Sequence, residues 1–150
     1  MDVVAELEPV HGRRLVAALQ GAFFVDEGRV QAAVDSRRSF NLIHLATMFK
    51  VDVFVSKRRP FDASSFARVR TETLARIPGH PKIPLASAED VLLAKLKWYR
   101  GGGETPKRHW DDVKGLLRVG KGTLDTAYLR RWAALVGVAD LLDRAISETD

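Results

Sequence analysis

Two apolar segments separated by only two residues constrain the fold of this chain more than any other feature. Residues 39–46 (SFNLIHLA) and 49–56 (FKVDVFVS) are rich in β-branched and large apolar side chains, and only Thr47 and Met48 lie between them. Strands joined by so short a connection pair antiparallel, because a parallel pair needs a long crossover. The sequence therefore predicts a β-hairpin at residues 39–56.

The segments on either side of this hairpin predict further strands and helices. Pro9 suits the first turn of a helix that ends at Gly21, and Asp26 can cap the next helix through its carboxylate. The expected elements are a strand at 2–8, a helix at 9–20, a short strand or irregular segment at 22–25, a helix at 27–37, a polar helix from Asp62 or Ser64 to about 75, and a short edge strand at 82–86 within a proline-rich connector.

The remainder of the chain predicts helices only. Ser87 followed by Asp90 is a capping-box variant, and it begins a helix that the glycines at 101–103 end. Further helices are expected at about 105–119, 124–136 and 138–147. The sequence thus predicts an α/β core at 1–86, with a mixed sheet and flanking helices, followed by a helical C-terminal segment at 87–150 that packs on it.

Composition limits the classes of function. The chain has 150 residues, a net charge of +5 and no cysteine, so disulfides and thiolate zinc sites are excluded. The lack of cysteine fits a reducing cytoplasm, and no apolar stretch reaches the roughly 20 residues of a membrane span. We therefore expect a cytoplasmic protein without a membrane partner. The positive charge favours anionic partners such as nucleotides or nucleic acid, although basic residues can equally form solvated faces.

Two acidic residues lie on predicted strands. Asp52 interrupts the run Val51–Val55, on the face that it shares with Phe54. It is either the solvated residue of an edge strand or a metal ligand or general base. If the first strand lies beside the hairpin, Asp2 and Asp52 converge at one end of the sheet and could hold magnesium, which prefers oxygen ligands. The alternative is that Asp2 is a frayed terminal residue.

A lysine and an acid lie on consecutive predicted helices. Lys95 falls on the apolar arc of its helix, near Val91 and Tyr99, whereas Lys97 lies on another face, so we expect Lys95 to be the more buried. Its ammonium should meet Asp112 or face the cleft above Asp52. Lys95 can contact a phosphate, extend to water along its stem, or pair with Asp112 to tie the two helices together.

Four stretches of the chain, DVVAEL, SFNLIHLATMFKVDVFV, ASAEDVLLAKLKWYR and HWDDVKGLL, resemble the nucleotidyltransferase superfamily, in particular small bacterial members near the AbiEii-type toxins. The resemblance implies a nucleotidyltransferase-like sheet and magnesium-dependent transfer of a nucleoside monophosphate, from a nucleoside triphosphate, to a hydroxyl of RNA or protein. It implies that Asp2 and Asp52 bind magnesium, that Lys95 contacts phosphate, and that Asp112 orients Lys95 or the acceptor.

The chain departs from the family pattern at its beginning. Members of the family open with a glycine-serine turn and a D-x-D pair; Asp2 matches the second acid of that pair and Asp52 the third acid, so the turn and the first acid would precede Met1. Either the start of the chain is assigned too late, or this is a short member with weak binding and transfer. The rival interpretations are a non-catalytic partner in a toxin–antitoxin system and a basic RNA-binding domain.

Overall fold

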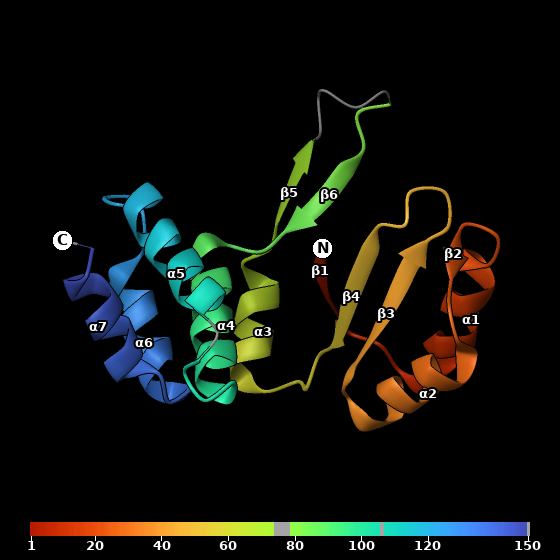
Figure 1. Cartoon of the computed structure of the whole chain (residues 1–150), viewed down its shortest axis with the longest axis horizontal. Helices are drawn as coiled ribbons and strands as arrows, with labels where there is room; N and C mark the ends of the chain where they lie inside the picture. Colours follow the sequence, from red (N-terminus) through yellow and green to blue (C-terminus); the bar gives the residue numbers. More distant parts are fainter. Residues whose placement is uncertain (74–78, 106, 150) are drawn as a thin grey trace. The chain divides into compact units, whose positions relative to one another are not determined.

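The computed structural model describes residues 1–73, 79–105 and 107–149, and the chain divides into two compact units at 62/63 (Figure 1). The protein is a mixed α/β protein. Its elements, in chain order, are β1 (Asp2–Ala5), α1 (Pro9–Leu19), β2 (Phe23–Phe24), α2 (Glu27–Ser36), β3 (Ser39–His44), β4 (Lys50–Val55), α3 (Pro60–Ala67), β5 (Arg70–Thr73), β6 (Lys82–Leu85), α4 (Ala88–Gly101), α5 (Lys107–Val119), α6 (Thr126–Leu135) and α7 (Ala139–Ser147).

The first unit is built on a four-stranded sheet with the order β1-β4-β3-β2. The predicted hairpin is confirmed, because β3 and β4 pair antiparallel with Asn41 opposite Asp52. β1 pairs parallel with β4, and Asp2 is the register partner of Asp52. The sheet is therefore mixed: β1 and β4 run parallel, whereas the β4–β3 and β3–β2 pairs are antiparallel. β1 is the first element of the described chain.

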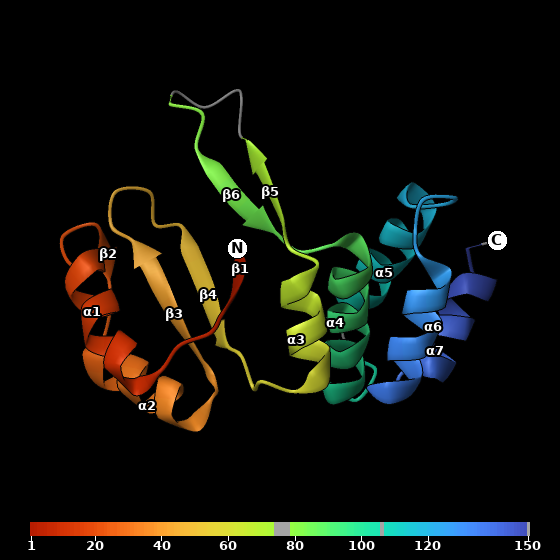
Figure 2. The same ribbon diagram turned by 180° about the vertical axis from the view of Figure 1, so that it is seen from behind.

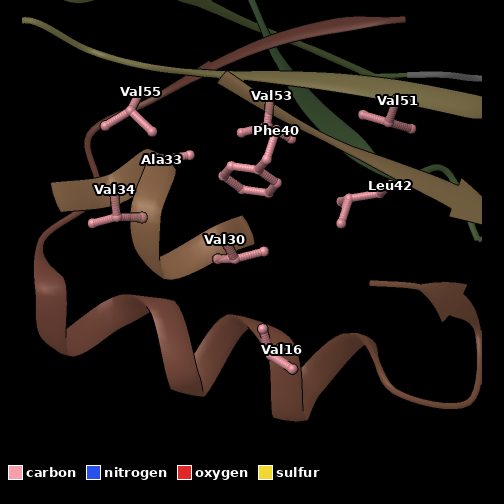
Figure 3. Close-up of a cluster of buried hydrophobic side chains, with 9 residues drawn as sticks. All are labelled: Val16, Val30, Ala33, Val34, Phe40, Leu42, Val51, Val53 and Val55. Atoms are coloured by element: carbon pink, nitrogen blue, oxygen red, sulfur yellow. The ribbon is translucent and has the colours of Figure 1, made fainter. Parts of the chain in front are cut away.

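Buried and more exposed side chains alternate along the strands, so the two faces of this sheet differ. Alternate residues of β4 are buried, and the side chains of β3 and β4 that share their face point toward α1 and α2 (Figure 3). The buried cluster comprises Val16, Val30, Ala33, Val34, Phe40, Leu42, Val51, Val53 and Val55. The helices thus cover one face of the sheet, and Asp2, Asp52 and Asn41 belong to the other face.

The second unit is helical apart from one hairpin. Three leucines of α4, Leu92, Leu93 and Leu96, are completely buried, and α4 packs against α5 and α6. The hairpin of β5 and β6 extends away from these helices (Figure 2), and all of its strand residues except Ile83 are exposed. No helix within the described ranges is long and apolar enough to cross a membrane.

Two features of the second unit differ from the sequence-based predictions. Residues 70–73 form a strand, although a helix was predicted to continue to about 75; residues 74 and 75 lie outside the described residues. The two compact units divide at 62/63, whereas the predicted boundary at 86/87 separates the α/β part of the sequence from the helical part. Arg68 explains part of this difference, because it binds Glu89 of α4 at 2.8 Å and so joins the segment before the hairpin to the helices.

Candidate functional site

Three oxygen-bearing side chains form a row across the open face of the first unit. Asp52 lies between two register partners, Asp2 on β1 and Asn41 on β3. Neighbouring strands are about 4.8 Å apart, and register partners project from the same face, so two carboxylates and one amide occupy a single level of the sheet. The predicted adjacency of Asp2 and Asp52 on one face is confirmed, and Asn41 is a neighbour that the sequence analysis did not identify.

A cation already lies next to this row. The Lys50 ammonium is 3.0 Å from the Asp52 Oδ1, and the Asp52 side chain retains 34% of its exposure. Lys50 also holds the start of β1, because its carbonyl accepts a hydrogen bond of 3.1 Å from the Met1 ammonium. Lys50 therefore offsets part of the charge repulsion between the carboxylates, and a metal ion bound here would compete with it.

Beside Asp52 lies a hollow of about 380 Å³ between α2 and the β3–β4 pair. Its polar and aromatic lining comprises the cations Arg29 and Arg38, the carboxylates of Asp26 and Asp52, the amide of Asn41 and the ring of Phe54. Neither arginine has a side-chain ion pair within the residues that the structure describes. Cationic, amide and aromatic groups together suit a ligand that carries both an anionic group and a flat ring.

The second unit holds the predicted lysine–acid pair. The Lys95 Nζ lies 2.6 Å from the Asp112 Oδ2, with the two side chains 20% and 39% exposed. This hydrogen bond holds the pKa of Asp112 below its ordinary value. The pair joins α4 to α5, as the sequence analysis proposed for its structural alternative, while Asp2 and Asp52 belong to the first unit.

The two lysines of α4, Lys95 and Lys97, fall in the same range of exposure. Both lysines are half-buried, so Lys97 is not the exposed side chain that its position on the helix suggested. The reason is geometric: α4 packs against both α5 and α6, so more than one of its faces is covered. Lys107 of α5, which is exposed, is a better reference for the effect of removing a lysine.

The most deeply buried charges lie elsewhere in the second unit. Asp90 and Glu89, at the start of α4, are 3% and 8% exposed. Arg68 binds Glu89 and lies 3.6 Å from Asp90, and its guanidinium stacks 4.0 Å above the ring of Tyr128. The Tyr128 hydroxyl donates to Asp90 at 2.7 Å, and the Asp125 N–H donates to Glu89 at 2.9 Å. Each buried carboxylate is thus partnered.

The sequence indicated only one part of this cluster. Ser87 and Asp90 were identified as a cap, and the Ser87 hydroxyl does bind Asp90 at 2.6 Å and accept from the Asp90 N–H. Arg68 and Tyr128 come from other elements, and no local pattern predicts that they meet Asp90. Among the described residues, this cluster ties the start of α4 to the segment after α3 and to α6, so its role is to position these elements.

We expect Tyr128 to ionise with a pKa of about 12, because burial and the hydrogen bond to Asp90 both raise it. The stability that the neutral phenol contributes is complete below the ordinary value of 10.0 and is lost as pH rises toward 12. Ultraviolet titration of tyrosinate should resolve this late step. This late step should vanish in Tyr128→Phe. A midpoint near the ordinary value would contradict the buried hydrogen bond.

Comparison of the chain with protein-family models, with curated proteins and with solved structures found no match. Among the described residues, no group of three or more histidine, cysteine, aspartate or glutamate side chains could hold a metal ion. The functional argument therefore depends on the geometry of this chain alone.

Proposed function

We propose that this protein is nucleotidyltransferase-like: it binds a magnesium–nucleoside triphosphate and transfers the nucleoside monophosphate to a hydroxyl of RNA or protein, with pyrophosphate as the leaving group. The observation that carries the proposal is the row formed by Asp2, Asp52 and Asn41 on one face of the sheet. Two carboxylates and an amide carbonyl match the ligand preferences of magnesium. The set is small, which favours a metal ion that arrives with the phosphates of its substrate.

Each side chain has a role that follows from its chemistry. Asp2 and Asp52 would hold the metal ion, which on binding would polarise the α-phosphate and activate the acceptor hydroxyl. Lys50 keeps Asp52 oriented through their ion pair before the substrate binds. Arg29 and Arg38 supply positive charge to the hollow beside Asp52, and Phe54 supplies a ring on which a base can stack.

Replacing Asp52 with asparagine should weaken magnesium-dependent nucleotide binding about tenfold or more, because one charge-assisted contact is lost at nearly unchanged shape. Asp2→Asn should act in the same direction. Calorimetric titration with a nucleoside triphosphate, with and without magnesium, measures the effect, and a radiolabelled transfer assay measures activity.

The matched control is Asp35→Asn. Asp35 is an exposed carboxylate on α2 that binds Gln31 at 3.0 Å, so the net charge changes equally. Nucleotide binding that needs no magnesium, or that is equal in Asp52→Asn and Asp35→Asn, would contradict the metal site.

Lys95 has a separate test, since the resemblance assigns it a phosphate contact. Lys95→Met should lower nucleotide affinity about tenfold or more while changing the free energy of unfolding by less than about 1 kcal/mol, because Asp112 remains 39% exposed and can be hydrated. Lys107→Met should change neither quantity. If Lys95→Met binds nucleotide as the unmodified chain does, Lys95 only ties α4 to α5.

A second candidate function is RNA binding without catalysis. Arg29 and Arg38 favour it, because both line the hollow and neither has an ion pair within the described residues. This function predicts RNA binding that weakens steeply with salt, does not depend on magnesium, and is unaffected by Asp52→Asn. The transferase function predicts instead that nucleotide binding depends on magnesium and weakens in Asp52→Asn.

A further inference from the structure

The hairpin of β5 and β6 has no role in the proposed function, and it is almost entirely exposed. Its two strands form a separate sheet, and every strand residue except Ile83 is exposed. An isolated two-stranded hairpin is at best marginally stable in water, whereas a sheet of three or more strands can be stable. Within the part of the chain that the structure describes, no third strand pairs with either edge. Both edges of this small sheet are therefore open there.

The two edges of the hairpin differ in what they offer to another strand. Thr71 lies opposite Pro84, which has no N–H, so this pair is one of those that exchange no hydrogen bonds. The N–H and C=O groups of Thr71 and Thr73 therefore point away from β6, toward the free edge of β5. At the free edge of β6, Pro84 provides no donor, and a proline there discourages pairing. β5 is thus the edge that can accept another strand.

Two opposite charges flank Thr71 on β5. Arg70 and Glu72 are exposed, and neither has an ion pair or a side-chain hydrogen bond within the described residues. These positions make the edge self-complementary. An antiparallel pairing of two copies of β5, centred on Thr71, places each Arg70 opposite Glu72 of the other copy. Opposite charges in such cross-strand positions stabilise a strand pair.

The backbone of β5 favours the same alignment. Thr71 then faces its own counterpart, and its outward N–H and C=O groups can exchange two hydrogen bonds with it. Arg70 and Glu72 form the intervening pairs, whose Cα atoms are only about 4.5 Å apart, so their side chains interact closely. Parallel pairing in register would instead place like charges side by side, which is destabilising.

We propose that a second copy of this chain binds here, with β5 paired antiparallel to β5 across Thr71, so that two hairpins form one four-stranded sheet. The interface is isologous, because each copy contributes the same residues. Since β5 has only four residues, the strand contact buries less than the roughly 1,200 Å² of a standard interface. The dimer should therefore dissociate on dilution.

Sedimentation velocity of the full chain at increasing concentration tests this pairing, and the dimer should become populated as the concentration rises. Glu72→Arg should weaken self-association about tenfold or more, because both cross-strand pairs then join like charges. Glu6→Arg is the matched control, since Glu6 is an exposed acid of the first unit and the net charge changes equally. A chain that stays monomeric at every concentration, or equal weakening in the two variants, would overturn the proposal.

A mixture of two variants tests the register. Arg70→Glu should lose self-association as Glu72→Arg does, because each variant carries two like charges on β5. A mixture of the two should form a heterodimer about as readily as the unmodified chain dimerises, since every cross-strand pair is again of opposite charge. A mixture that remains monomeric would overturn the proposed alignment.

A backbone substitution tests the edge itself. Thr71→Pro removes an outward N–H and should abolish the dimer, whereas Thr71→Val should retain it. The lost N–H does not face β6, and the position is exposed, so circular dichroism should report an intact fold for both variants. A dimer that survives Thr71→Pro would use another surface and overturn the proposal. Binding of single-stranded RNA by the hairpin without any dimer would also overturn it.

Discussion

Replacing Arg68 with leucine is expected to lower the free energy of unfolding by about 3 kcal/mol. The substitution leaves Glu89 and Asp90 without their cation, and the side chains of these acids are only 10% and 2% exposed. Removing one partner of a buried ion pair is strongly destabilising, because the remaining charge is neither paired nor hydrated. Chemical denaturation of the variant and of the unmodified chain measures the difference.

The pH dependence identifies the cause of that loss. Burial alone would raise the pKa of Glu89, but the Asp125 and Glu89 N–H groups, with Ser87 and Arg68, lower it below its ordinary value of 4.5. The stabilisation is complete above 4.5 and disappears as pH falls through the lowered pKa. Arg68→Leu removes one of the contacts that lower the pKa of Glu89. The difference in free energy of unfolding between the variant and the unmodified chain should therefore become smaller at acidic pH.

Two comparison variants complete this experiment. Arg70→Leu, in exposed β5, should change the free energy of unfolding by less than about 0.5 kcal/mol. Glu89→Gln, introduced into Arg68→Leu, should recover part of the lost stability by removing the unpaired charge. If Arg68→Leu were no more destabilising than Arg70→Leu at neutral pH, the cluster would contribute nothing to the fold.

Replacing Leu96 with alanine should also cost about 3 kcal/mol. Leu96 is completely buried in α4, so the truncated side chain leaves a cavity in addition to the lost transfer of apolar surface from water. Leu135→Ala is the matched control, because this leucine of α6 is 66% exposed and should change stability by less than about 0.5 kcal/mol. Thermal or chemical unfolding measures both.

The comparison of these two leucines is stringent because the chemical change is identical. Both substitutions remove the same atoms, but Leu96 lies inside α4 and Leu135 is the last residue of α6. The higher helix propensity of alanine therefore favours Leu96→Ala slightly more, so a larger loss of stability at Leu96 reflects its burial. Equal destabilisation by Leu96→Ala and Leu135→Ala would mean that α4 is not the centre of the helical unit.

Features that depend on neighbouring residues could be predicted from the sequence. The Ser87 cap, the β3–β4 hairpin and the helices of the second unit each follow from patterns within one segment. The strand at 70–73 could not be predicted, because its partner lies beyond a proline-containing connector: Thr73 pairs with Lys82 and Arg70 with Leu85. Pairing of that kind overrides the weak helical preference of the segment.

The same distinction holds for the candidate sites. Lys95 and Asp112 lie on consecutive helices, so their positions on the two helical faces made their contact one of the two predicted arrangements, and it is the one that the structure contains. Asn41 and Asp52 meet only because the hairpin adopts one particular register, and the sequence analysis assigned none. Arg68 and Tyr128 converge on Asp90 from distant segments, which only the packed structure can reveal.

The parallel pairing of β1 with β4 has a consequence for the order of folding. The hairpin of β3 and β4 closes a short loop, whereas β1 must return across α1, β2, α2 and β3 to reach β4. The entropy of closing that longer loop delays the contact, so β1 docks onto a hairpin that already exists. We therefore expect Asp2 and Asp52 to meet only after the hairpin has formed, so that any ability of the sheet to hold a metal ion arises after that step.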